Sequence, residues 1–165
     1  MRHAENQALL RYWHTLRAGR PCPLRAEIDP RHMLCNISHL FILEDLGGGN
    51  IRFRLAGSAL THLFWMELRG MPLSAILTQP ASESLREVVS ETLAEPGVAS
   101  VTLRRTDERG RTGFDVWELA LLPLRSDRGA VDRLIGALHP LDAAAAELVA
   151  PPLVFATDEI EITPV

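Results

Sequence analysis

The chain contains no lysine, and all 17 of its basic residues are arginines. Without a lysine amine the protein has no lysine Schiff base, no lysine general base and no phosphate-loop lysine. Aromatic residues make up only 5% of the sequence, too few for the stacking surfaces that bind single-stranded nucleic acids. These absences exclude several classes of enzyme and binding protein at the outset.

Cysteines and long apolar runs are also scarce. The two cysteines, Cys22 and Cys35, form neither a CxxC pair nor a cluster with zinc-ligand spacing. Such a pattern is typical of reduced thiols in a cytosolic protein. No run approaches the roughly 18 apolar residues of a membrane span, and the N-terminus lacks the apolar segment of a signal peptide. We therefore expect a cytoplasmic protein with no membrane partner.

The charge is unevenly distributed along the chain. The formal net charge is −4, yet the residues up to Leu141 hold all 17 arginines. The charged residues after Leu141 are all acidic, namely Asp142, Glu147, Asp158, Glu159 and Glu161. Neither the near-neutral body nor the acidic tail has the basic stripe that a phosphate backbone requires, so nucleic acid is not an expected partner.

The first segment with a clear period is an amphipathic helix over residues 5–17. Leu9, Trp13 and Leu16 recur on one helical face, and Gly19 and Pro21 then end the helix. A single helix ahead of a domain must bury its apolar stripe. The stripe packs either on the chain's own domain or on a second copy.

The remaining pattern predicts an α+β domain with one antiparallel sheet. Asp29 and Pro30 are a typical start for a short helix that ends near Ser38. Strands are predicted at 40–44 and 51–55, joined by a Gly-rich loop, and again at 98–105, 114–124 and 133–139. Between them lie two or three short helical turns over 58–77 and a longer helix over 81–93. Strands at both ends with helices between them favour a single sheet covered by helices.

Five motifs in this order resemble the PAS domain family, in particular a stand-alone PAS subfamily common in alphaproteobacteria. They are Arg25-Ala-Glu-Ile-Asp-Pro30, His39-Leu-Phe-Ile-Leu-Glu44, Phe53-Arg-Leu-Ala-Gly57, Glu67-Leu-Arg-Gly70 and Glu118-Leu-Ala-Leu-Leu-Pro-Leu124. Gly136 also stands in the last strand, where the family has a small residue. The resemblance implies a five-stranded ββ-αααα-βββ sheet. We expect an N-terminal helix and linker over 1–24, the PAS domain over 25–141 and an acidic tail over 142–165.

The resemblance implies sensing or signalling, and we expect a dimeric module that acts through a partner signalling protein. Leu9, Trp13 and Leu16 are the candidates for the homodimer interface, although packing of Trp13 on its own sheet is an equal alternative.

The alternative function is binding of a small apolar ligand or haem in a PAS cavity. The candidate lining residues are Phe41, Phe53, Leu55, Leu60, His62, Leu63, Leu77, Val101 and Leu103. Among the six histidines, His62 is the best candidate for an axial haem ligand, and no histidine pair has the spacing of a helical zinc site. Trp65 and Met66 replace the small residues usual in the family, and a large side chain there could plug the cavity.

No set of residues in the sequence predicts catalysis. Glu44 and Glu118 interrupt apolar strands, and we expect arginines across the sheet, such as Arg52 or Arg54, to pair with them. An isomerase-like enzyme on a similar fold would need a carboxylate or histidine inside the pocket, whereas the predicted inward residues are apolar.

Overall fold

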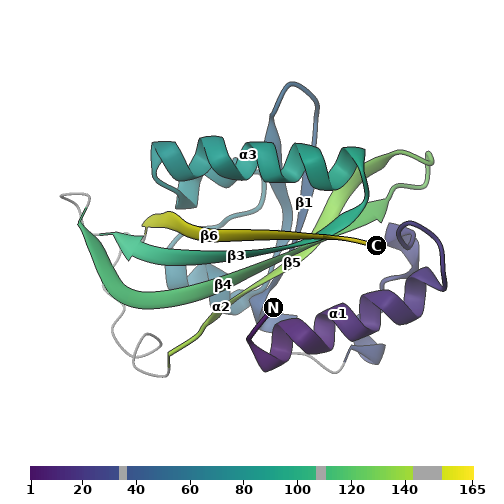
Figure 1. Cartoon of the computed structure of the whole chain (residues 1–165), viewed down its shortest axis with the longest axis horizontal. Helices are drawn as coiled ribbons and strands as arrows, with labels where there is room; N and C mark the ends of the chain where they lie inside the picture. Colours follow the sequence, from purple (N-terminus) through teal and green to yellow (C-terminus); the bar gives the residue numbers. More distant parts are fainter. Residues whose placement is uncertain (34–36, 107–110, 143–153) are drawn as a thin grey trace.

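The computed structural model describes residues 1–33, 37–106, 111–142 and 154–165. Three α-helices are present in these ranges, α1 (Ala4–Arg17), α2 (Ser58–Phe64) and α3 (Gln79–Ala94). Four 3-10 turns accompany them, η1 (Arg25–Glu27), η2 (Pro30–His32), η3 (Ile37–His39) and η4 (Leu73–Ile76). The strands are β1 (Leu40–Asp45), β2 (Ile51–Ala56), β3 (Gly97–Thr106), β4 (Thr112–Arg125), β5 (Val131–Pro140) and β6 (Val154–Pro164). The predicted α+β class is confirmed (Figure 1).

The strands form one antiparallel sheet in the order β2-β1-β5-β4-β3-β6. The five predicted strands are all present, but the predicted strand number was wrong because the acidic tail supplies a sixth strand. β6 pairs with β3 from Gly97 opposite Pro164 to Thr106 opposite Val154. The acidic residues of β6 hid the two-residue alternation at Ile160 and Ile162. A strand with such alternation can pack its apolar face on the core while its other face is charged.

One face of the sheet, here called the inner face, is covered by α2, η4 and α3. Its core is built from apolar side chains of these helices and of all six strands. Phe155 on β6 is fully buried there, and its ring contacts Phe64 and Trp117 edge to face. The amide of Thr78, at the start of α3, donates to the carbonyl of Phe155. Part of the predicted tail is therefore built into the core, while residues 143–153 lie outside the described residues.

The opposite face, here called the outer face, carries α1 (Figure 1). Leu9 and Trp13 of α1 are fully buried against small and aliphatic side chains of β4 and β5. The Trp13 indole nitrogen also donates to the carbonyl of Pro123 at 2.8 Å. α1 ends at Ala18, whose left-handed backbone turns the chain toward Gly19, as the sequence predicts.

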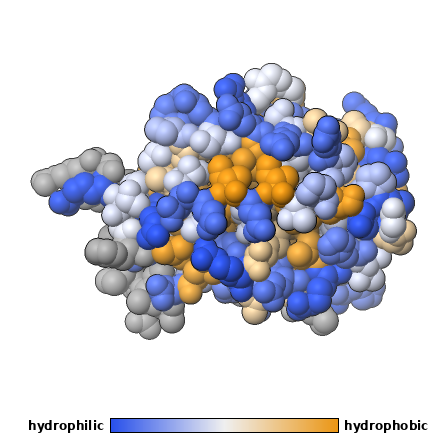
Figure 2. Space-filling view, in the orientation of Figure 1, coloured by the Kyte–Doolittle hydropathy of each residue, from blue (hydrophilic) through white to orange (hydrophobic). Residues whose placement is uncertain are grey.

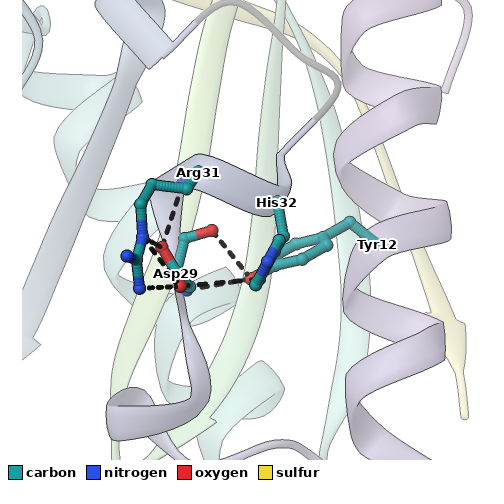
Figure 3. Close-up of polar contacts among 4 residues, drawn as sticks. All are labelled: Tyr12, Asp29, Arg31 and His32. Carbon is teal, nitrogen blue, oxygen red and sulfur yellow. Dashed lines mark hydrogen bonds and ion pairs between the residues drawn. The ribbon is translucent and has the colours of Figure 1, made fainter.

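The segment between α1 and β1 is fastened to α1 by polar contacts (Figure 3). The Tyr12 hydroxyl accepts from the Asp29 amide at 2.9 Å and donates to the Asp29 carbonyl at 3.2 Å. The Asp29 carboxylate caps η2 through the Arg31 amide and pairs with the Arg31 guanidinium, and His32 lies 3.5 Å away. Asp29 is thus the helix cap that the sequence predicts, although the helix is a single turn. Cys22 is a buried free thiol, and Cys35 lies outside the described residues.

Candidate functional site

Seven of the nine predicted pocket residues lie together in the inner core. They are Phe41, Phe53, Leu60, Leu63, Leu77, Val101 and Leu103, and none is more than 9% exposed. The rings of Phe41 and Phe53 meet edge to face at 5.6 Å between centroids. The inner face thus gathers the side chains that the sequence assigned to a ligand pocket, and these side chains pack against one another.

Leu55 does not face this core, so the prediction for it was wrong. It is 49% exposed, and its partner across the hairpin is Ile42, which belongs to the outer-face cluster. Phe53, two residues earlier, pairs with Leu43 on the inner face. A register shift between Ile42 and Leu43 sends Phe53 and Leu55 to opposite faces, which simple alternation could not predict.

His62 and Trp65 also point away from the inner core. α2 buries Leu60, Leu63 and Phe64, which leaves His62 on its solvent side. His62 therefore does not fit the role of an axial ligand to a group held on the inner face. Trp65 is 72% exposed and ends α2 with a left-handed backbone (φ 51°), so it does not plug the core.

The predicted dimer residues are placed mainly inside the chain. Leu9 and Trp13 are 0% exposed because α1 lies on the chain's own sheet, and Leu16 is half-buried. The interpretation in which Trp13 packs on its own sheet matches the structure. Leu9 and Trp13 therefore offer no surface to a second copy while α1 is docked.

Glu118 on β4 lies at the centre of the contact between α1 and the outer face. Within the described chain, it does not form the expected ion pair with the guanidinium of an arginine across the sheet. Its carboxylate accepts from the backbone amides of Arg2 at 2.5 Å and His3 at 2.9 Å, and from the Asn6 side chain at 2.9 Å. Glu118 is 1% exposed, and Asn6 is fully buried. Although burial opposes ionisation, the donated hydrogen bonds hold the pKa of Glu118 below its ordinary value. A buried carboxylate thus anchors the first turn of α1.

Three histidines stack beside this carboxylate. The His139 ring on β5 lies between the rings of His3 and His39, with centroid distances of 4.3 and 4.6 Å. His139 is 3% exposed, and its Nε2 has no hydrogen-bond partner among the described residues. Burial, aided by the facing His3 and His39, lowers the pKa of His139 to about 3, while Glu118 acts in the opposite direction. Burial likewise lowers the pKa of His39. His139, at the centre of the stack, is therefore neutral at pH 7.

The sequence did not predict this stack. The three histidines are far apart along the chain, and only the pairing of β1 with β5 and the docking of α1 bring them together. Within the described ranges, no three His, Cys, Asp or Glu side chains are placed to share a metal ion. The stacked rings instead form a buried, titratable contact between the N-terminus of α1 and the sheet.

Glu44 behaves as the sequence predicts. It pairs with Arg54 on β2, and also with Arg133 on β5 at 3.1 Å. Glu44 is 8% exposed and lies on the outer face, next to Ile42 and two strands away from Glu118. A charge ladder across β2, β1 and β5 therefore accompanies the α1 contact on the same face.

β6 is one of the two edge strands of the sheet, and β2 is the other. Figure 2 shows apolar side chains gathered where Figure 1 places β6 below α3. Ile160 on β6 is 41% exposed, and Asp158, Glu159 and Glu161 surround it in sequence. Charged side chains on an edge strand oppose its pairing with another strand.

The helices of the described part of the chain are all too short or too polar to cross a bilayer.

A family model described as "PAS domain" matches residues 1–139. Among solved structures, the light state of the blue-light photoreceptor Aureochrome1 LOV is 16% identical, with a TM-score of 0.47, covering 68% of this chain and 88% of that chain. The LOV protein of Rhodobacter sphaeroides is 15% identical, with a TM-score of 0.48, covering 64% of this chain and 60% of that one. VqmA bound to DPO is 16% identical, with a TM-score of 0.44, covering 64% and 53%. No curated protein matches the sequence.

Proposed function

Because the chain belongs to the PAS domain family, whose members are sensory signalling modules, we propose that it is a sensor that acts through a partner protein and uses α1 as its movable element. The observation that carries this proposal is the buried polar contact between the first turn of α1 and the sheet, here called the seat of α1. Glu118 and His139 are the anchors of that seat, and both can change charge. We place the protein in the cytoplasm, with no enzymatic activity of its own and no nucleic-acid partner.

The seat of α1 has the character of a two-state contact. Leu9 and Trp13 supply apolar burial, while Arg2, His3 and Asn6 supply hydrogen bonds to one carboxylate. If that carboxylate stays buried without these donors, only the Ser100 hydroxyl of the described residues still donates to it, and a buried charge with so few partners costs several kcal/mol. The first turn of α1 is therefore either fully bound or released, and such bistable packing is what turns a small change into a signal.

Trp65 is the residue that we propose for contact with the partner protein. Its side chain is 72% exposed, and tryptophan is enriched at the centres of protein interfaces. A left-handed backbone at a large residue costs about 1–2 kcal/mol, so stability alone does not favour tryptophan at this position. Binding to a partner gives a physical reason for an exposed tryptophan held in this conformation.

A homodimer is also part of the proposal. Its interface must use side chains other than Leu9 and Trp13, because these are buried within the chain. Light scattering over a range of protein concentrations measures the mass directly. A mass that stays at one chain of 18.3 kDa would remove the homodimer from the account.

Binding of a small apolar ligand in the inner core is the second candidate function, because seven predicted pocket residues meet there. Native mass spectrometry of freshly purified protein tests it. Extra bound mass that is lost in a variant of Leu103 would favour this function, and bare polypeptide would count against it.

The partner proposal is tested by affinity purification from the native host. Tagged wild type, Trp65→Ser and Glu118→Ala are compared, with Arg69→Gln as the matched exposed control. We expect one set of proteins to co-purify with wild type and the control, to be lost with Trp65→Ser and to change in amount with Glu118→Ala. The same proteins in all four samples would contradict the proposal.

A further inference from the structure

An apolar hollow of about 260 Å³ lies on the outer face, beside the segment that connects α1 to β1. Ile28 and Met33 from that segment form one wall, and Leu55 and Ile135 from the sheet form another. Leu55 reaches this hollow because of the register shift between β1 and β2. Leu55 and Ile135 place the hollow on the outer face, and Phe41, which belongs to the inner core, also borders it.

Polar contacts hold the outer wall of the hollow in place. Tyr12 binds both the amide and the carbonyl of Asp29, as Figure 3 shows. Arg20 binds the Glu27 carboxylate through two contacts of 2.8 and 2.9 Å, and the same carboxylate accepts from the Leu24 amide. Arg20 lies just beyond α1 and also donates to the carbonyl of Leu16 in the last turn of α1. The connecting segment is thus tied to α1 directly by Tyr12 and indirectly through Arg20, so the hollow is a built feature.

Arg25 is the one charged residue among the described residues that line the hollow. The acids nearest to it in sequence are already bound, because Glu27 pairs with Arg20 and Asp29 pairs with Arg31. No hydrogen bond or ion pair joins the Arg25 side chain to another part of the described chain, and Arg25 is half-buried. A half-buried guanidinium with no acceptor, next to an apolar hollow, offers a fork of donors that matches a carboxylate.

We propose that this hollow binds a small amphipathic carboxylate, with the acid group on Arg25 and the alkyl chain between Met33, Leu55 and Ile135. A volume of about 260 Å³ holds roughly nine water-sized groups, the size of a carboxylate with a chain of about eight carbons. Arg25 opens the motif Arg25–Pro30, and the α1 mechanism supplies no role for Arg25 itself. The binding depends on Arg25 and the hollow alone, so it stands or falls separately from the output of α1.

The test uses octanoate and the full chain, followed by methyl NMR. We expect octanoate to shift the methyl signals of Met33, Leu55 and Ile135 in a saturable way, and to leave those of Leu60 and Val101 in the inner core unchanged. Hexanoate should bind about tenfold more weakly, because it buries two fewer methylene groups. Arg25→Gln should weaken octanoate about tenfold through loss of the charged hydrogen bonds.

Two controls decide between specific and general effects. Arg86→Gln removes an arginine from α3, on the other side of the sheet, and should leave octanoate binding unchanged. Leu55→Trp keeps Arg25 but fills the hollow from β2, and should abolish octanoate binding. This variant also tests the site if Arg25→Gln fails to fold. Three outcomes would each overturn the proposal: equal octanoate affinity in wild type and Arg25→Gln, shifts confined to the inner core, or octanoate binding to wild type no more tightly than hexanoate.

Discussion

The two faces of the sheet are covered in different ways. The inner face is packed with aliphatic and aromatic side chains from three helical elements, and its core includes Phe155 from the last strand. The outer face is covered by α1 through a smaller apolar cluster. All buried carboxylates and the buried histidine of the described chain, Glu44, Glu118 and His139, lie on the outer face.

This difference separates stability from response. Apolar burial is not directional and depends little on pH, so the inner core holds the fold together. Buried charges and histidines need specific partners, and they lose those partners when the charge changes. The outer face is therefore the part of the molecule that we expect to open first.

The largest effect is expected in the inner core. Leu103→Ala removes a fully buried side chain and should lower the free energy of unfolding by about 3 kcal/mol. Urea denaturation followed by far-UV circular dichroism measures the change. Leu46→Ala is the control, because Leu46 is 50% exposed, and a similar loss in both variants would remove the special role of the inner core.

The next effect belongs to the seat of α1. Glu118→Ala leaves the donors of Arg2, His3 and Asn6 without their acceptor, and should weaken the docking of α1 by about 2–3 kcal/mol.

Limited proteolysis within residues 1–24 detects this release, while the circular dichroism of the sheet should change little. Glu91→Ala on the exposed side of α3 is the matched control. If Glu118→Ala unfolds the entire sheet in a single transition, the two faces are not separable.

The histidine stack predicts an acid-sensitive stability. His139 keeps a pKa of about 3 in the folded chain, whereas an unfolded histidine has its ordinary value of 6.5. Between these values the unfolded chain binds a proton that the folded chain does not bind, so stability falls as the pH falls below 6.5. From pH 7.5 to 5.0 the loss should be about 2 kcal/mol for this residue.

The window above pH 5 lies above the ordinary pKa of Glu118, so its own titration contributes little there. Urea denaturation at both pH values measures the loss. His139→Gln should flatten the pH dependence, while the exposed His62→Gln should keep it. An unchanged slope in His139→Gln would show that the stack does not control it.

The smallest effect on stability is expected at Trp65. Trp65→Gly relieves the left-handed backbone but adds freedom to the unfolded chain, so the unfolding free energy should change by less than about 1 kcal/mol. Thermal denaturation measures this. A loss of several kcal/mol would show that Trp65 supports the fold and would weaken its proposed role in partner binding.

Much of the fold could be predicted from the sequence because its signals are local. The alternation at Ile51, Phe53 and Arg52 predicts β2, and the stripe at Leu9 and Trp13 predicts α1. β6 was missed because its acidic residues resemble a solvated tail.

The candidate site was less predictable because its contacts are not local. The register shift at Ile42 reverses Leu55, and three distant histidines meet only after α1 docks. Whether a strand side chain points to the inner or the outer face depends on β-bulges, which the amino-acid composition does not reveal. The seven inner-core residues were predicted correctly as a group facing one side, since no such shift separates them.

Hydrogen exchange of the native protein at pH 7.5 tests most directly whether the outer face opens first. We expect the amides of α1 to exchange through a local opening of lower free energy than those of α3, β3 and β4, and Glu118→Ala to speed the exchange of α1 alone. If α1 exchanges only with global unfolding, at the same free energy as the inner core, the outer face is not a movable element and the account is contradicted.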